Sequence, residues 1–184
     1  MRQGKSQMKI IKVVAFITIL LNSSNASSEL VETYWEGSSD VNNTSLTLDT
    51  SSGLEWLDLS YTEGMSWNQV NEMIMGGPLK GFRMATLKEL MRFLKAAGVN
   101  KSGFNPKNVG EWENMRTLID LIGSTYETGV VIGRYNDPKC RCKNMHNRWG
   151  LRALPIKGYT LSYPYGKVSD NARWVYSTGS FLVR

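Results

Sequence analysis

The densest group of side chains capable of chemistry lies between residues 140 and 146. Cys140, Cys142, Met145 and His146 offer thiolate, thioether and imidazole groups within seven residues. Such donors suit Cu(I) or Zn(II), so one hypothesis is a copper or zinc site, or a redox enzyme, centred on Cys140 and Cys142. Because the spacing matches no well-specified metal motif, the interpretation that we favour is a chain without a cofactor.

The same two cysteines also raise the question of a disulfide. In an oxidising compartment two cysteines tend to pair. A bond across one intervening residue needs a bent backbone, because the Cα atoms must approach to about 4.4–6.8 Å. Three outcomes therefore stay open for Cys140 and Cys142: a strained local disulfide or unpaired thiols without function, a disulfide that links two copies into a dimer, or the metal site.

A second group consists of aromatic and polar side chains in the last third of the chain. These residues are Tyr135, Asp137, Asn147, Arg148, Trp149, Tyr163 and Tyr165. Aromatic faces beside amide, carboxylate and hydroxyl groups suit sugar rings, which offer an apolar face and directional hydrogen bonds. We expect these residues to lie in loops and to bind a glycan, a polymer or another cell-surface partner. The competing interpretation places Trp149 in the core, because most tryptophans bury most of their area.

Catalysis has less support than binding. His146 is the only histidine, and no G-x-S-x-G segment accompanies it as the setting of a nucleophile. The chain also lacks a P-loop and a G-x-G-x-x-G segment. Hydrolysis by a pair of carboxylates stays open, because aspartates and glutamates occur throughout the chain. We therefore expect a protein without catalytic residues.

The N-terminal segment has the pattern of an export signal. Residues 1–12 carry four basic and no acidic side chains, residues 13–21 are almost entirely apolar, and small polar residues follow up to Ala26. An apolar run this short does not cross a bilayer, because a membrane-spanning helix needs about 20 residues. We predict a signal peptide over residues 1–26, cleaved after Ala26, and a periplasmic or secreted product with no stable membrane span.

Cleavage would change the charge balance of the chain. The full sequence has 22 Lys and Arg against 16 Asp and Glu, a net charge of +6. Four of the basic residues and none of the acidic residues lie in the predicted signal, so the remainder is close to neutral. Nucleic-acid binding needs a clustered basic surface. We therefore expect no nucleic acid among the partners.

Hydrophobic patterning predicts one α+β domain over residues 45–184, after a loose lead-in over residues 27–44 with a short strand at Thr33–Trp35. Strands at 45–49 and 54–59 form a hairpin around Gly53. Helices start after Ser66 and Thr86, each with the spacing of a capping box, and a third helix covers 111–122. Further strands are expected at 81–85, 130–133, 151–154, 159–163, 173–176 and 179–184.

Several of these segments resemble known exported bacterial domains. The residues that carry the resemblance are Asp49, Gly53, Trp56, Asp58, Arg83, Thr86, Glu89 and the closing segment 179–184. They are similar to "D-x-x-T-G-L-x-W-L-D", "G-W-R-x-A-T-x-x-E" and "G-x-F-L-V-R" motifs in proteins with PEP-type sorting signals. They also resemble the Lcl C-terminal-type domain of bacterial collagen-like adhesins. Phe82 and Ala85 depart from that pattern, where Trp and Pro are usual.

The resemblance implies a C-type-lectin-like or formylglycine-generating-enzyme-like fold, with two or three helices packed on small antiparallel sheets and long loops. The motif residues also have a purely structural explanation, in which Gly53 serves a turn and Arg83 pairs with Asp58 or Glu89. A binding domain, a metal or redox enzyme, and a structural envelope protein are therefore the three functional hypotheses, in that order.

Overall fold

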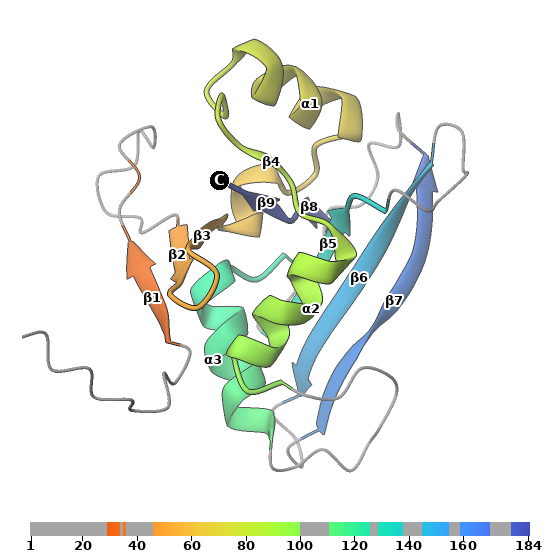
Figure 1. Ribbon diagram of the computed structural model, residues 1–184. Helices are drawn as coiled ribbons and strands as arrows, with labels where there is room; N and C mark the ends of the chain where they lie inside the picture. The colour runs from red at the N-terminus through yellow and green to blue at the C-terminus, as the bar shows by residue number, and fades with distance from the viewer. Residues whose placement is uncertain are drawn as a thin grey trace, which may run out of the picture.

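The computed structural model describes residues 29–33, 35, 46–99, 111–125, 129–137, 145–154, 159–169 and 178–184, with the backbone alone at 145, 146, 154, 159–161 and 163–169. This part of the chain is an α+β fold with three helices and two small, mainly antiparallel sheets (Figure 1). No helix within it is both long and apolar enough to cross a membrane. The predicted signal at 1–26 and the predicted strand at 173–176 lie outside the described residues.

The first sheet has the strand order β1-β2-β3-β9-β4. Its strands are β1 (Leu30–Thr33), β2 (Leu46–Asp49), β3 (Leu54–Leu57), β4 (Arg83–Met84) and β9 (Leu182–Val183). The β2–β3 hairpin confirms the predicted turn, since Gly53 has a φ of 70° and the Gly53 amide donates to the Asp49 carbonyl. The edge strand β1 starts earlier than the strand predicted at Thr33–Trp35.

The predicted second hairpin strand is too long by two residues. β3 ends at Leu57, and a 3-10 helix, η1 (Leu59–Thr62), follows it. Asp58 caps this helix by accepting a hydrogen bond from the Ser60 amide at 2.8 Å. The turn places Leu59 in the same buried cluster as Trp56, although a strand continued to Leu59 would place these two side chains on opposite faces.

All three predicted helices are confirmed: α1 (Trp67–Gly76), α2 (Leu87–Ala96) and α3 (Trp112–Ile122). Ser66 with Gln69, and Thr86 with Glu89, form complete capping boxes at α1 and α2. Figure 1 shows α2 and α3 between the first sheet and the long strands of the second sheet. The helix faces predicted to be buried are those that pack inward, among them Leu90, Leu94, Leu118 and Ile119.

The second sheet has the strand order β7-β6-β5-β8. It contains β5 (Val130–Tyr135), β6 (Met145–Leu154), β7 (Tyr159–Ser169) and β8 (Gly179–Ser180). β5, β6 and β7 are longer than predicted and take in segments that the sequence assigned to loops. Tyr135, Asn147, Arg148, Trp149 and Tyr165 therefore lie on strands rather than in loops, and Tyr163 lies on β7, within the strand predicted at 159–163.

The C-terminal segment joins the two sheets. Residues 179–184 were predicted as one strand, but β8 pairs in parallel with β5, and β9 pairs with β3 and β4. Phe181 lies between β8 and β9 and is fully buried. Two glycines permit this close approach, because a Cβ at Gly133 would lie 2.4 Å from the Phe181 ring and one at Gly179 would lie 2.4 Å from the Leu59 carbonyl oxygen.

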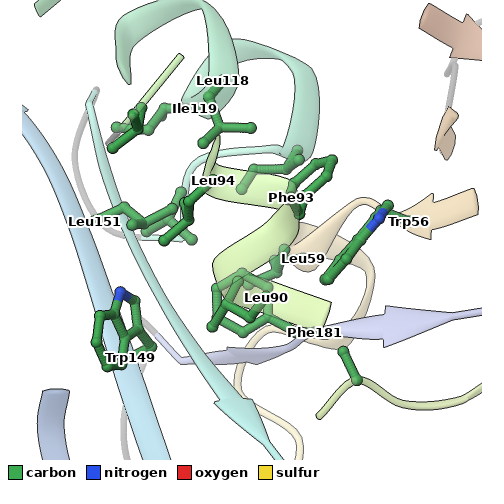
Figure 2. Close-up of a cluster of buried hydrophobic side chains, with 14 of the residues drawn as sticks. Trp56, Leu59, Leu90, Phe93, Leu94, Leu118, Ile119, Trp149, Leu151 and Phe181 are labelled. Carbon is green, nitrogen blue, oxygen red and sulfur yellow. The ribbon is translucent and has the colours of Figure 1, made fainter. Parts of the chain in front are cut away.

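The larger of two buried clusters lies where the helices meet both sheets (Figure 2). Trp56 stacks on Phe93 of α2 with ring centroids 4.1 Å apart, and Phe181 approaches Trp56 edge-on at 6.5 Å. A smaller cluster lies between α1 and the first sheet, around Trp35 and Phe82. Because Trp56 and Leu57 point into different clusters, β3 is buried on both of its faces.

Candidate functional site

Helix α2 is anchored at its start and presents an exposed polar face. The Ala85 amide donates to the Phe181 carbonyl at 2.8 Å, and the Asn136 amide donates to the Ala85 carbonyl at 2.8 Å. The residue that caps α2, Thr86, forms a parallel bridge with Asn136. The start of the helix is therefore hydrogen-bonded to β5 on one side and to the C-terminal segment on the other.

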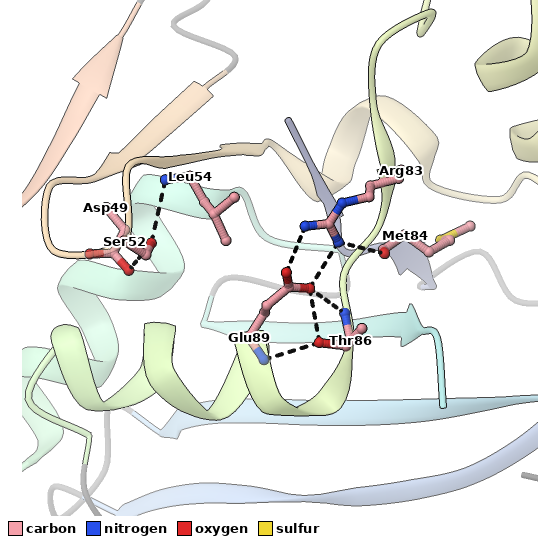
Figure 3. Close-up of polar contacts among 7 residues, drawn as sticks. All are labelled: Asp49, Ser52, Leu54, Arg83, Met84, Thr86 and Glu89. Carbon is pink, nitrogen blue, oxygen red and sulfur yellow. Dashed lines mark hydrogen bonds and ion pairs between the residues drawn. The ribbon is translucent and has the colours of Figure 1, made fainter. Parts of the chain in front are cut away.

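An ion pair fixes the first turn of α2 (Figure 3). Arg83 donates to both carboxylate oxygens of Glu89, at 2.6 and 2.9 Å, and the Thr86 amide and hydroxyl donate to Glu89 Oε2 at 2.8 and 2.9 Å. The hydrogen bond from Arg83, supported by Thr86 against the effect of burial, lowers the pKa of Glu89 to about 2. Of the two partners predicted for Arg83, Glu89 is therefore the one observed, and its carboxylate is fully occupied.

A groove lies between the β2–β3 turn and one side of α2. It has a volume of about 710 Å³, and we call it the Ser51 groove. Its lining residues are Ser51, Ser52, Leu54, Glu89, Arg92, Lys95 and Ala96. This volume falls within the range of small-molecule sites, which span about 300–1,000 Å³.

Asp49 orders the hydroxyl groups of the Ser51 groove. The Ser51 hydroxyl donates to Asp49 Oδ1 at 2.6 Å, and the Ser52 hydroxyl donates to Oδ2 at 2.7 Å. Burial opposes ionisation of Asp49, but hydrogen bonds from Ser51 and Ser52 outweigh it and lower the pKa of this carboxyl group. Each serine oxygen keeps acceptor capacity for a ligand hydroxyl group.

A second groove, of about 570 Å³, runs along the other side of α2, and we call it the Met91 groove. Its lining residues are Thr86, Leu87, Lys88, Met91, Arg92, Lys95 and Asp137. The surface that it presents is mostly apolar, since Leu87 and Met91 contribute their side chains and the basic residues contribute aliphatic stems. Arg92 and Lys95 line both grooves, so the two hollows meet at one pair of cations.

Three basic side chains project from α2 into solvent: Lys88, Arg92 and Lys95. None of them forms an ion pair with a carboxylate among the residues that the structure describes. Lys88 and Lys95 are seven positions apart along the helix, which corresponds to about 10 Å at 1.5 Å per residue. Glu89 is neutralised by Arg83, so the exposed face of α2 carries net positive charge.

The structure brings together some of the predicted ligand residues, but in the core. Tyr135 and Trp149 are 4% and 6% exposed, and their rings meet edge-on with centroids 6.4 Å apart. The Trp149 indole nitrogen donates to the Ser162 hydroxyl at 2.9 Å. The faces of these two rings are therefore covered by protein and do not form an open platform for a sugar.

Asp137 and Asn147 form a pair at the end of the β5–β6 ladder. The Asn147 side-chain amide donates to Asp137 Oδ2 at 2.8 Å, and Asp137 is the one predicted ligand residue that lines a groove. Burial, with the charge of Asp137 beside it, raises the pKa of Tyr135. The side chains of Tyr163 and Tyr165 lie outside what the structure describes, although their backbone belongs to β7.

Arg148 lies half-buried on β6, directly opposite Arg134 on β5. Arg134 is almost fully buried and donates hydrogen bonds to the carbonyl groups of Gly179 and Met65. Burial, and then the charge of Arg148, lower the pKa of Arg134 to about 10. This guanidinium group ties β5 to β8 and to the segment before α1, which is a structural role.

The predicted metal ligands lie at the edge of what can be described. Cys140 and Cys142 fall outside the described residues, so the predictions about their disulfides stay predictions. Met145 and His146 lie on β6, where only their backbone is described. Among the side chains that the structure does place, no three His, Cys, Asp or Glu residues lie close enough to hold a metal ion.

Sequence reasoning missed the α2 face. Lys88, Arg92 and Lys95 recur at the i, i+4, i+7 spacing that places residues on one side of a helix, and the one acidic residue of α2, Glu89, is paired with Arg83. The sequence therefore contains a signal for this face of α2. It contains no signal for the two grooves, because Ser51 and Asp137 approach α2 only in the folded chain.

Comparison of the chain with family models, with curated proteins and with solved structures found no match.

Proposed function

We propose that this chain is an exported, non-enzymatic binding domain of the Lcl C-terminal-like type, with a C-type-lectin-like fold. Its ligand is a negatively charged glycan or cell-surface polymer that lies against the exposed face of α2. Export is supported by the basic and apolar pattern of residues 1–26, and the fold by the capped helices on small sheets.

The observation that carries the proposal is the convergence of two grooves on one set of cations that have no ion-pair partner in the described part of the chain. Lys88, Arg92 and Lys95 face solvent from a helix whose start is held by backbone and ion-pair contacts to both sheets. Long side chains on a fixed helix bind anionic groups with little reorganisation of the protein backbone. The hydroxyl groups of Ser51 and Ser52 add hydrogen-bonding capacity that suits a saccharide.

The test compares an acidic polysaccharide with a neutral one of similar length, by calorimetry on the purified protein. A variant in which Lys88, Arg92 and Lys95 are all replaced by Gln should bind the acidic polymer about tenfold more weakly, since each exposed charge contact contributes roughly 0.2–1 kcal/mol. A higher salt concentration should also weaken the binding of the acidic polysaccharide to the wild-type protein, because salt screens exposed charges.

Lys80→Gln is the matched control, because Lys80 is an exposed lysine that lines neither groove. It should leave the affinity for the acidic polymer unchanged. Equal binding of neutral and acidic polymers, or an unchanged affinity in the triple variant, would contradict the proposal.

A further inference from the structure

The two grooves beside α2 differ in chemistry although they share Arg92 and Lys95. The Ser51 groove offers two ordered hydroxyl groups. The Met91 groove offers the side chains of Leu87 and Met91 and very little polar surface. A single ligand that occupies both grooves must therefore change from polar to apolar as it passes the two cations.

We propose that the ligand is an anionic amphiphile, a saccharide that carries an acyl chain next to an anionic group. The acyl chain lies in the Met91 groove, the anionic group contacts Arg92 and Lys95, and the sugar hydroxyl groups contact Ser51 and Ser52. This inference rests on the proposed function, because it names the chemical class of the ligand that the α2 face binds.

The apolar groove is the first argument for an acyl chain. Leu87 and Met91 are only partly covered by the core and leave apolar surface open to water along the groove. A sugar ring alone would cover this surface only with the C–H groups of one ring face, which removes less apolar area from water than an extended acyl chain. An acyl chain removes it directly, and Met suits such a role because its unbranched side chain adapts to a flexible partner.

Charge is the second argument, and it decides where the anionic group lies. Lys88, Arg92 and Lys95 border the Met91 groove, and the one carboxylate that lines it, Asp137, accepts a hydrogen bond from Asn147. Three cations against one carboxylate favour an acid over a neutral lipid. Since Arg92 and Lys95 also border the Ser51 groove, the charged group belongs at the junction of chain and sugar.

Calorimetry with three probes below their micelle concentrations tests the inference. The probes are a short-chain lysophosphatidic acid, glycerol phosphate and octyl glucoside, which supply tail with charge, charge alone, and tail with a neutral sugar. The lysophosphatidic acid should bind at least about tenfold more tightly than glycerol phosphate, because each buried methylene group contributes about fourfold. It should also bind more tightly than octyl glucoside.

Met91→Gln should remove most of the advantage of the tail, by about threefold or more, while leaving the affinity for glycerol phosphate unchanged. Met75→Gln is the matched control, because Met75 is 77% exposed on α1 and lines neither groove. In a second measurement, lysophosphatidic acid should displace the acidic polysaccharide from the wild-type protein.

If lysophosphatidic acid and glycerol phosphate bound equally well, the inferred role of the acyl chain would be overturned. If octyl glucoside bound as well as lysophosphatidic acid, the inferred role of the anionic group would be overturned. Failure to displace a bound acidic polysaccharide would overturn a shared site. In each of these cases the acidic polysaccharide would still bind through Lys88, Arg92 and Lys95, so the proposed function would stand. Loss of that binding as well would overturn both.

Discussion

The ion pair of Glu89 with Arg83 makes a quantitative prediction about the anchoring of α2. Glu89→Gln removes the charge and keeps one side-chain oxygen. With that oxygen in the place of Oε2, the Thr86 amide and one Arg83 N–H keep their acceptor, so the variant loses the hydrogen bond from Arg83 to Oε1 and the charge of the pair. The helix should still form, because its apolar face packs against the core. Stability should fall, and the loss should depend on pH.

The size of the loss follows from the pKa and from exposure. The pKa of Glu89 falls from 4.5 to about 2, and at about 1.4 kcal/mol per pKa unit an unscreened shift corresponds to roughly 3 kcal/mol. The Arg83 side chain is 51% exposed and that of Glu89 is 20% exposed, so solvent screens the pair. Fully exposed pairs contribute about 0.2–1 kcal/mol. A bidentate pair with one covered partner lies between these limits, and we expect about 1.5 kcal/mol.

The sign of the pH dependence is fixed by the direction of the shift. Because the pKa of Glu89 is lower in the folded state, its contribution is present above pH 4.5 and is lost as the pH falls toward about 2. Urea unfolding at pH 7, 4 and 3 measures this loss. The difference in unfolding free energy between wild type and Glu89→Gln should be largest at pH 7 and should shrink toward pH 3.

Glu72→Gln supplies the control, because Glu72 is an exposed glutamate on α1. It should change the unfolding free energy by less than about 0.5 kcal/mol. If Glu89→Gln and Glu72→Gln had equal effects, or if the Glu89→Gln difference were the same at every pH, the reasoning about this ion pair would be refuted.

Two further predictions concern the free energy of unfolding, which urea unfolding at neutral pH measures. Gly123→Ala should cost about 3 kcal/mol or more, because φ is +78° and the new Cβ would lie 1.9 Å from Asp58 Oδ1, whereas Gly53→Ala, with φ +70° and open space, should cost about 1–2 kcal/mol. Trp149→Phe removes a buried indole hydrogen bond and should cost about 1–3 kcal/mol more than Trp56→Phe, whose indole nitrogen has no partner among the placed side chains. Equal costs within either pair would contradict the assigned cause.

The candidate site shows what residue types can predict about a binding site when the distances between the residues are unknown. The aromatic residues were chosen as a sugar platform for their chemistry, but Tyr135 and Trp149 lie on paired strands and are buried. Alternation along β6 carries part of this signal, because the buried Trp149 and Leu151 alternate with Arg148 and Arg152. The long β6–β7 pairing, with a bulge at Arg148 and Trp149, depends on partners in another segment.

The amino-acid sequence alone determined the features that depend on neighbours along the chain. Both capping boxes, the β2–β3 turn at Gly53 and the buried faces of α2 and α3 follow from side chains within a few residues of one another. Such contacts form with little loss of chain entropy, so their residue patterns are direct signals.

Only the tertiary structure decided where the proposed binding face lies. The Ser51 groove needs the β2–β3 turn beside α2, and the Met91 groove needs Asp137 from the end of β5. Nothing local to α2 encodes these neighbours, because they are brought together by the packing of two sheets around one core. For the same reason, the burial of Trp149 and the division of residues 179–184 between both sheets were decided by the fold.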